Sequence, residues 1–382
     1  MMNGSEQHNL RTSASRQAEG IPAGSCGDFF PLTPALSLGE RVRVRGNGTP
    51  FATATQTGTE LVELCESFGH SRRLPKAMMR WSGPLAGALC LGLWWIGADC
   101  GAAVVFETTS PYHHIRVLDE AGTRTLSFDG SAETRMSLQN PLQGHFEYTE
   151  YFHMPWLWNS QLTNVLMIGL GGASTQRAYR HYYPDVTVET AELDPAVLRV
   201  AKAYFGFQES ATQRVQLADG RVFIRRAEGP YGAIIVDAYT KSRYGSFIPY
   251  HLATKEFFEL ADQRLTTNGV LAYNVIGTFQ GWRADILGSV YKTMKEVFPQ
   301  VYFFPAQETL NVVVVGVKSK EKLSPTALQQ RANALLLSKR IRLPTFRARL
   351  MALRTEPPLN FQRCQVLTDD YAPVDGLLTR GR

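Results

Sequence analysis

The sequence is poor in cysteine, and this scarcity argues against a fold held by disulfides and against a metal site built from cysteines. Five cysteines occur in 382 residues, and four of them, Cys26, Cys65, Cys90 and Cys100, precede the part of the chain with a globular composition. Only Cys364 lies within that part, and no CxxC pair is present. Neither a disulfide framework nor a cysteine-rich metal site is therefore expected.

The chain also lacks a strong charge of either sign. Its formal net charge is +6, from 40 lysines and arginines against 34 aspartates and glutamates. This balance permits an anionic ligand but does not call for nucleic acid, so no nucleic-acid partner is expected. Apolar residues make up 44% and charged residues 19%, as in an ordinary globular protein, and the length suggests two or three folding units.

Sustained hydrophobic periodicity is missing from residues 1–77, which are rich in Gly, Ser, Thr and Arg. We interpret them as a disordered lead, or as a stretch upstream of a true start at Met78 or Met79. Residues 78–103 then have the order of a signal peptide, with basic residues, an apolar run within 84–98 and small residues.

The apolar run within 84–98 is shorter than the roughly 20 residues that span a bilayer. We expect a cleaved signal or membrane association through this run, and a location in the periplasm or on the cytoplasmic side of the membrane. A buried core helix is the alternative interpretation.

Strand-like segments dominate residues 104–158. In 112–118 and 123–128, β-branched and aromatic residues alternate with other types around glycine-containing turns, which predicts a small antiparallel β domain. His113 and His114 are adjacent, so on a strand they face opposite sides and are not expected to share a metal.

The segment 159–320 alternates strands and helices, which is typical of a nucleotide-binding α/β sheet. Four strand-like runs end in glycines or acids, and these residues are Gly169, Gly171, Gly172, Glu192, Asp219, Gly220 and Asp237. Glycines permit a sharp turn and close approach of a ligand to the backbone. An acid about 20 residues later can accept both hydroxyls of a ribose, and Glu192 has this spacing. Because ligands of open α/β sheets bind beyond the carboxyl ends of the strands, these residues predict a nucleoside site.

Three further features complete the pattern. Asp194 before Pro195 predicts a helix cap, because aspartate caps helices and proline is tolerated at the first helical position. A long polar loop is expected at 238–249. The C-terminal part, 321–382, is expected to be a helical tail with a solvated basic face, and its motif at 367–374 has no role that chemistry assigns.

Together these motifs resemble the spermidine synthase (polyamine aminopropyltransferase) family, and especially its bacterial spermidine-synthase-like branch. The resemblance covers about residues 104–317 and rests on 112–115, 126–130, 148–150, 165–172, 192–194, 219–220 and 236–237, with the tail at 368–374. It implies an N-terminal antiparallel β domain followed by an α/β, class I methyltransferase-like (Rossmann-like) sheet. It also implies transfer of an aminopropyl group from decarboxylated S-adenosylmethionine to a polyamine, without a metal, in a homodimer.

The resemblance also implies residue roles. The glycine turn would lie against the thioether side of the nucleoside, Glu192 would hold the ribose, and Asp219 and Gly220 would lie at the adenine. Asp237 would be the catalytic acid–base residue, since the attacking amine must be neutral. The residues of the acceptor site would be Tyr112, His113, Glu133, Tyr148, Glu150 and Tyr239.

Five positions depart from the family pattern, most of them in the acceptor site. The acid of the family's glycine turn is Gly172 here, and the second acid of the diamine site is Thr240. The usual Gln and His residues are replaced by His113, Glu133 and Thr149. The family's nucleoside-site residues are therefore retained, whereas the polyamine site has lost several of its usual side chains.

These departures leave three functions open. The first is aminopropyl transfer to a polyamine, because Glu133, Glu150 and Asp237 still provide three carboxylates for a dication, whose charge is costly to bury unpaired. The change at Gly172 leaves open a methyltransferase that uses intact S-adenosylmethionine. The signal-like segment leaves open an exported nucleoside-binding protein without catalytic turnover.

Overall fold

The computed structural model describes residues 101–242, 245–281, 283–359 and 361–377. The expected lead at 1–77, the apolar run within 84–98 and the candidate start sites therefore lie outside the described residues. Among the helices of the described part, none is long and apolar enough to cross a membrane.

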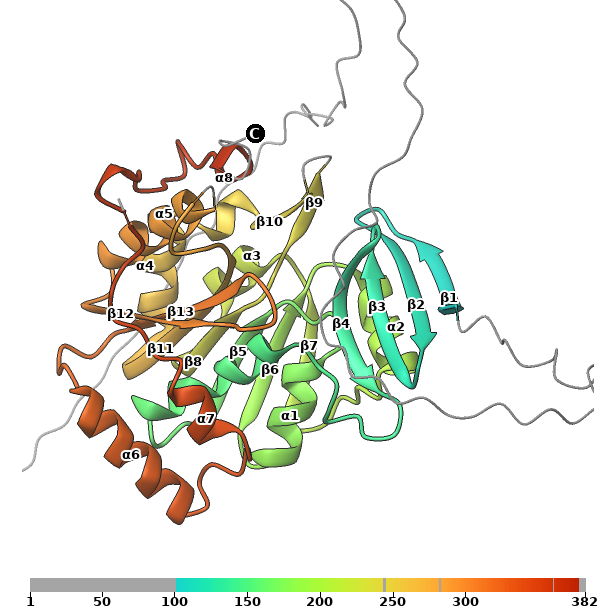
Figure 1. The fold of residues 1–382 in the computed structure, drawn as a ribbon, viewed down its shortest axis with the longest axis horizontal. Coiled ribbons are helices and arrows are strands. Elements are labelled where there is room, and N and C mark those ends of the chain that lie inside the picture. Colours follow the sequence, from blue (N-terminus) through green and yellow to red (C-terminus); the bar gives the residue numbers. More distant parts are fainter. Residues whose placement is uncertain (1–100, 243–244, 282, 360, 378–382) are drawn as a thin grey trace, which may run out of the picture. The chain divides into compact units, whose positions relative to one another are not determined.

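Four antiparallel strands form a small sheet in the order β1-β2-β3-β4 (Figure 1). They are β1 (Ala103–Thr109), β2 (His114–Glu120), β3 (Thr123–Phe128) and β4 (Ser131–Ser137). Ile115, Val117 and Leu126 are fully buried in one cluster with Val197 and Val200 of helix α2 (Pro195–Tyr204). The sheet therefore packs its apolar face on α2, and the predicted antiparallel β domain is confirmed.

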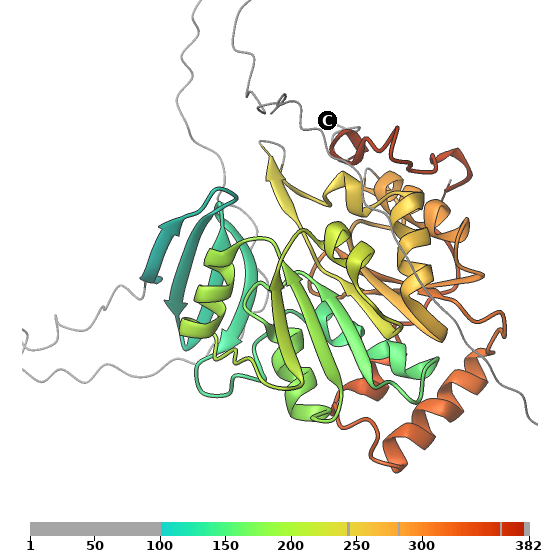
Figure 2. The same ribbon diagram turned by 180° about the vertical axis from the view of Figure 1, so that it is seen from behind.

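The second sheet has seven strands in the order β12-β13-β11-β8-β5-β6-β7, as Figures 1 and 2 show from opposite sides. They are β5 (Asn164–Ile168), β6 (Thr187–Glu192), β7 (Gln213–Leu217), β8 (Tyr231–Val236), β11 (Leu265–Ile276), β12 (Gln300–Pro305) and β13 (Asn311–Val317). β13 pairs antiparallel with both β12 and β11, whereas β7, β6, β5, β8 and β11 run parallel to one another. This is the predicted α/β, methyltransferase-like sheet.

Alternate residues of the central strands supply two cores. Val165 and Met167 of β5 belong to one cluster, and Leu166 and Ile168 belong to another, because successive side chains of a strand point to opposite faces. The helices of this part are α1 (Ser174–Tyr182), α3 (Gly220–Arg226), α4 (Lys255–Arg264), α5 (Ala284–Lys295), α6 (Pro325–Leu337), α7 (Phe346–Leu350) and α8 (Val374–Leu377). Asp194 caps α2 by accepting from the amide of Ala196 at 2.8 Å, as expected.

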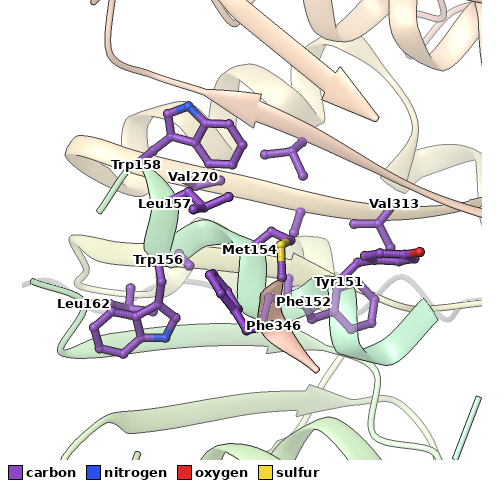
Figure 3. Close-up of a cluster of buried hydrophobic side chains, with 14 of the residues drawn as sticks. Tyr151, Phe152, Met154, Trp156, Leu157, Trp158, Leu162, Val270, Val313 and Phe346 are labelled. Atoms are coloured by element: carbon purple, nitrogen blue, oxygen red, sulfur yellow. The ribbon is translucent and has the colours of Figure 1, made fainter. Parts of the chain in front are cut away.

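The segment Glu147–Leu157 differs from its expected place in the β domain. It forms a 3₁₀ helix, η1, in which every residue is buried. Figure 3 shows Tyr151, Phe152 and Met154 packed with Val313 of β13 and Phe346 of α7. The segment therefore belongs to the core of the α/β part, because its aromatic side chains cover one face of the large sheet.

The loop expected at 238–249 contains a short hairpin. Its strands are β9 (Thr240–Ser242) and β10 (Gly245–Phe247), which pair antiparallel, and the 3₁₀ helix η2 (Tyr250–Leu252) follows. Among its described residues, the C-terminal tail is helical in α6, α7, α8 and the 3₁₀ helix η3 (Phe361–Arg363), and the stretch between α6 and α7 contains Pro344.

Candidate active site

A cavity of about 610 Å³ opens at the carboxyl ends of the central parallel strands. Its volume lies in the range of small-molecule sites. Most of the residues singled out in the sequence line it, namely Tyr112, His113, Glu133, Tyr148, Gly169, Gly171, Glu192, Asp219, Gly220, Asp237 and Tyr239. The small β sheet and the α/β part thus both contribute walls to one site.

The first glycine of the turn after β5 is required by backbone packing. Gly169 has a φ of +101°, and a Cβ there would lie 2.1 Å from the carbonyl oxygen of Asp237. The amide of Asp237 also donates to the carbonyl of Ile168 at 2.9 Å. The glycine therefore brings the ends of β5 and β8 together, and this contact places Asp237 at the cavity.

Gly172, by contrast, is not among the residues that line the cavity. Its amide donates to Oγ1 of Thr134 at 2.9 Å, and a Cβ at this position would lie 2.6 Å from Cγ2 of Thr134. The side chain of Thr134 therefore occupies the space that an acid would need here. The expectation that Gly172 contacts the nucleoside is replaced by a packing role between β4 and the turn.

Glu192 ends β6 and is held by two backbone amides. Its Oε2 accepts from Leu170 at 3.0 Å and its Oε1 accepts from Asp194 at 2.8 Å. Burial raises the pKa of Glu192 to about 7, although these hydrogen bonds oppose the rise. These bonds fix the orientation of the carboxyl group, which lines the cavity.

Asp219 caps α3 and contacts a histidine that the sequence pattern did not reveal. Its Oδ1 accepts from the amides of Arg221 at 3.0 Å and Val222 at 2.9 Å, and its Oδ2 lies 2.8 Å from Nε2 of His251. The hydrogen bond with His251 is the main cause of the lowered pKa of Asp219. His251 lies in η2 and also lines the cavity. Nothing in its sequence context marks it, because its partner is 32 residues away.

Asp237 follows β8 and is held by two side chains from other elements. Its Oδ1 accepts from Nδ2 of Asn274 at 2.8 Å, and its Oδ2 accepts from the phenol of Tyr148 at 3.1 Å. Burial raises the pKa of Asp237 to about 6, against the opposing effect of both hydrogen bonds. Asn274, a cavity residue on β11, was not singled out in the sequence.

Glu133 supplies a second carboxylate at this end of the cavity. Burial raises its pKa to about 7, and the negative charge of Asp237 adds to the rise. Two carboxylates in a buried site repel each other, so they favour a shared proton or a bound cation. The arrangement therefore suits the binding of an amine.

Three more of the residues expected in the acceptor site, Tyr112, His113 and Tyr239, line the cavity in different ways. Tyr112 is 48% exposed at the rim of the cavity. The ring of His113 stacks on Phe128 with centroids 4.5 Å apart, and its Nδ1 lies 3.4 Å from Asp129. The phenol of Tyr239 donates to the carbonyl of Asn274 at 2.9 Å, which fixes the ring in the cavity wall.

Glu150 is not at the cavity, contrary to the expectation that it contacts substrate. It accepts from Nε of Arg349 and from Nε2 of His145 at 3.1 Å. Burial alone would raise the pKa of Glu150, but these hydrogen bonds outweigh it and lower the pKa to about 2. Because η1 turns this carboxylate toward α7, its charge is neutralised by arginine and is not available to a ligand.

No group of three or more His, Cys, Asp or Glu side chains in the described part of the chain is arranged to hold a metal ion. His113 and His114 have separate partners, since Nε2 of His114 lies 2.7 Å from Glu107.

The chain is similar to known proteins in sequence and in fold. Residues 145–325 match the family described as the spermine/spermidine synthase domain. The chain is 31% identical over 286 residues to a polyamine aminopropyltransferase of Vibrio vulnificus, which covers 72% of this chain and 91% of that protein. It is 32% identical over 188 residues to an eEF1A lysine and N-terminal methyltransferase of Xenopus laevis, but this match covers 47% of the chain and 26% of that protein.

A solved structure shares the fold. The probable spermidine synthase from Corynebacterium glutamicum ATCC 13032 aligns with 71% of this chain and 98% of its own, with a TM-score of 0.54 and 16% sequence identity. At this identity the likeness shows a common fold alone.

Proposed function

The chain belongs to the spermidine synthase (polyamine aminopropyltransferase) family, and we propose that it transfers an aminopropyl group from decarboxylated S-adenosylmethionine to a polyamine or related amine. The observation that carries the proposal is the shared cavity of Glu192 and Asp237. A carboxylate fixed by backbone amides lies at the end of β6, and a buried acid lies at the end of β8.

The donor would lie along the ends of the parallel strands. Glu192 would accept the ribose hydroxyls, and the wall made by Asp219 and His251 would face the adenine. The glycine turn at Gly169 and Gly171 would leave room for the sulfonium group. None of these contacts requires a metal, because the leaving sulfur is already a sulfonium.

The acceptor would bind between Asp237, Glu133 and the ring of Tyr239. Its neutral amine nitrogen attacks the propyl carbon next to sulfur, the C–S bond breaks, and its electron pair remains on sulfur to give methylthioadenosine. The proton released from the amine passes to the carboxylate of Asp237. A pKa of about 6 keeps this group deprotonated at neutral pH, and such a base accelerates transfer by about 10²–10⁴-fold.

A methyltransferase that uses intact S-adenosylmethionine is the second candidate. The contact of Gly172 with Thr134 favours it, because no acid remains there for the amine of the decarboxylated donor. The partial similarity to methyltransferases of eEF1A agrees with this alternative. An exported nucleoside-binding protein without turnover is the third candidate.

Product analysis distinguishes the three candidates. The full chain is incubated with a diamine and each donor, and the sulfur-containing products are identified by mass spectrometry. We expect methylthioadenosine from the decarboxylated donor. S-adenosylhomocysteine from the intact donor would instead support the methyltransferase, and nucleoside binding without either product would support the binding protein.

Location and assembly are separate proposals. The signal-like segment favours the periplasm or the membrane surface, which cell fractionation tests. The family resemblance favours a homodimer, which sedimentation of the purified chain tests.

A further inference from the structure

The C-terminal motif at 367–374 is docked on the α/β part near the nucleoside end of the cavity. The carboxylate of Asp369 pairs with Arg221 of α3 in a bidentate arrangement, with both N–O distances 2.6 Å. The carbonyl of Leu367 accepts from the amide of Lys255 at 2.8 Å, and the side chain of Leu367 is fully buried. Thr254 also donates to Asp369 at 2.7 Å. The motif is therefore held by defined contacts.

Arg221 connects this motif to the cavity wall. Its Nη1, which contacts Asp369, also donates to the carbonyl of His251 at 3.1 Å. The ring of His251 in turn contacts Asp219, and both residues line the cavity. A continuous set of polar contacts thus runs from the tail to the proposed adenine site.

The charge of Arg221 needs a partner, because its side chain is only 13% exposed. The hydrogen bond with Asp369 is the largest cause of its raised pKa, and the charges of Glu256 and Asp219 also contribute. Asp219 is two residues away, at the start of the same helix. Without Asp369, the guanidinium is expected to turn toward Asp219 and to compete with His251 for its carboxylate.

We propose that Asp369 is a positioning residue for nucleoside binding, which holds Arg221 away from Asp219 so that His251 and Asp219 keep their places in the cavity wall. The inference rests on the proposed function, since it assigns the nucleoside to this wall. It gives the motif at 367–374 a role that its sequence alone does not suggest.

The test measures the binding of methylthioadenosine to the full-length Asp369→Asn chain by calorimetry, together with steady-state kinetics. We expect about tenfold weaker nucleoside binding and a similar rise in donor KM, the scale of one hydrogen bond to a charged group. The kcat at saturating donor and the KM for the amine should not change. Asp370→Asn is the matched control, because Asp370 is exposed and forms no ion pair with a residue that the structure describes.

A second substitution separates positioning from simple loss of structure. Adding Arg221→Gln to Asp369→Asn removes the guanidinium that would compete with His251 for Asp219, so part of the lost affinity should return. Asp369→Glu alone should retain most of the affinity. A double variant weaker than Asp369→Asn would overturn the inference, as would unchanged affinity in Asp369→Asn. If the unaltered chain binds no methylthioadenosine, the proposed function fails and the inference fails with it.

Discussion

The phenol of Tyr148 donates to the carboxylate of Asp237 at 3.1 Å, although 89 residues separate them in the chain. Tyr148 comes from η1, which covers the large sheet, and Asp237 follows β8. Asn274 of β11 holds the other carboxylate oxygen at 2.8 Å. Three elements thus fix the orientation of one buried acid, which is the requirement for a base that acts on a positioned amine.

Removing the proposed base should slow the transfer step strongly but leave nucleoside binding nearly unchanged. We expect Asp237→Asn to lower kcat by about 10²–10⁴-fold, because the amide cannot accept the amine proton. Calorimetry with methylthioadenosine should give nearly the same affinity as the unaltered chain. Asp185→Asn serves as the control, since Asp185 is exposed on the surface. Equal turnover in Asp237→Asn would remove the assignment of the base.

The hydrogen bond from Tyr148 should be visible in the pH dependence of the rate. Burial raises the pKa of Asp237, and the Tyr148 hydrogen bond opposes that rise. Since the base must be deprotonated, kcat should increase as the pH passes about 6. In Tyr148→Phe the rise of kcat with pH should move to higher pH by about one unit, because the loss of one hydrogen bond to a charged group raises the pKa of Asp237 by about that much. A rise that stays in place would show that the tyrosine does not tune Asp237.

Glu133 should contribute to amine binding but not to nucleoside binding. Glu133→Gln removes one of the two carboxylates at this end of the cavity, so the KM for the amine should rise about tenfold. The donor KM should stay unchanged, because Glu192 and Asp219 are untouched. Glu120→Gln, an exposed change in the same β sheet, is the control. A larger effect on the donor KM than on the amine KM would contradict the placement of the acceptor.

Arg349 should be important for stability, because it pairs with both Glu147 and Glu150, whose side chains are 3% and 9% exposed. Arg349→Ala removes the arginine that pairs with two buried carboxylates and should lower the free energy of unfolding by about 3 kcal/mol at pH 7. The folded-state pKa of Glu150 is lowered to about 2, so its stabilising contribution is lost as the pH falls toward that value.

Urea denaturation at pH 7 and pH 4 tests this expectation, and the difference between the two chains should be smaller at pH 4. Arg347→Ala is a matched control on the same helix, since Arg347 is exposed and donates to Asn333. Comparable losses of stability in both variants would argue against a special role for the Arg349 pairs.

Much of the large sheet was predictable from the sequence, because local signals decide it. The apolar run before Gly169, the cap at Asp194 and the acid at Asp237 each reflect a strand end or helix start within a few residues. Position at the carboxyl edge of a parallel sheet then follows from topology. Glu192 ends β6 and Asp237 directly follows β8, and both accordingly line one cavity.

The partners of these acids were not predictable, because they depend on tertiary packing. Glu150 meets Arg349, which is 199 residues away, so its neutralisation has no local signal. The 3₁₀ segment η1 has neither helical nor strand periodicity, and Pro155 lies within it. His251 and Asn274 reach the site from a short 3₁₀ helix and a buried strand, respectively, and no motif marks either of them.

The most direct test of the account is calorimetric titration of the full chain with methylthioadenosine, before and after Glu192→Ala. We expect one nucleoside to bind per unaltered chain, and binding to be at least about tenfold weaker in the variant, since a carboxylate that accepts ribose hydroxyls is lost. Equal affinity in the two chains, or no binding by the unaltered chain, would contradict the proposal that Glu192 and its neighbouring strand-end acids surround an adenosine-bearing sulfonium.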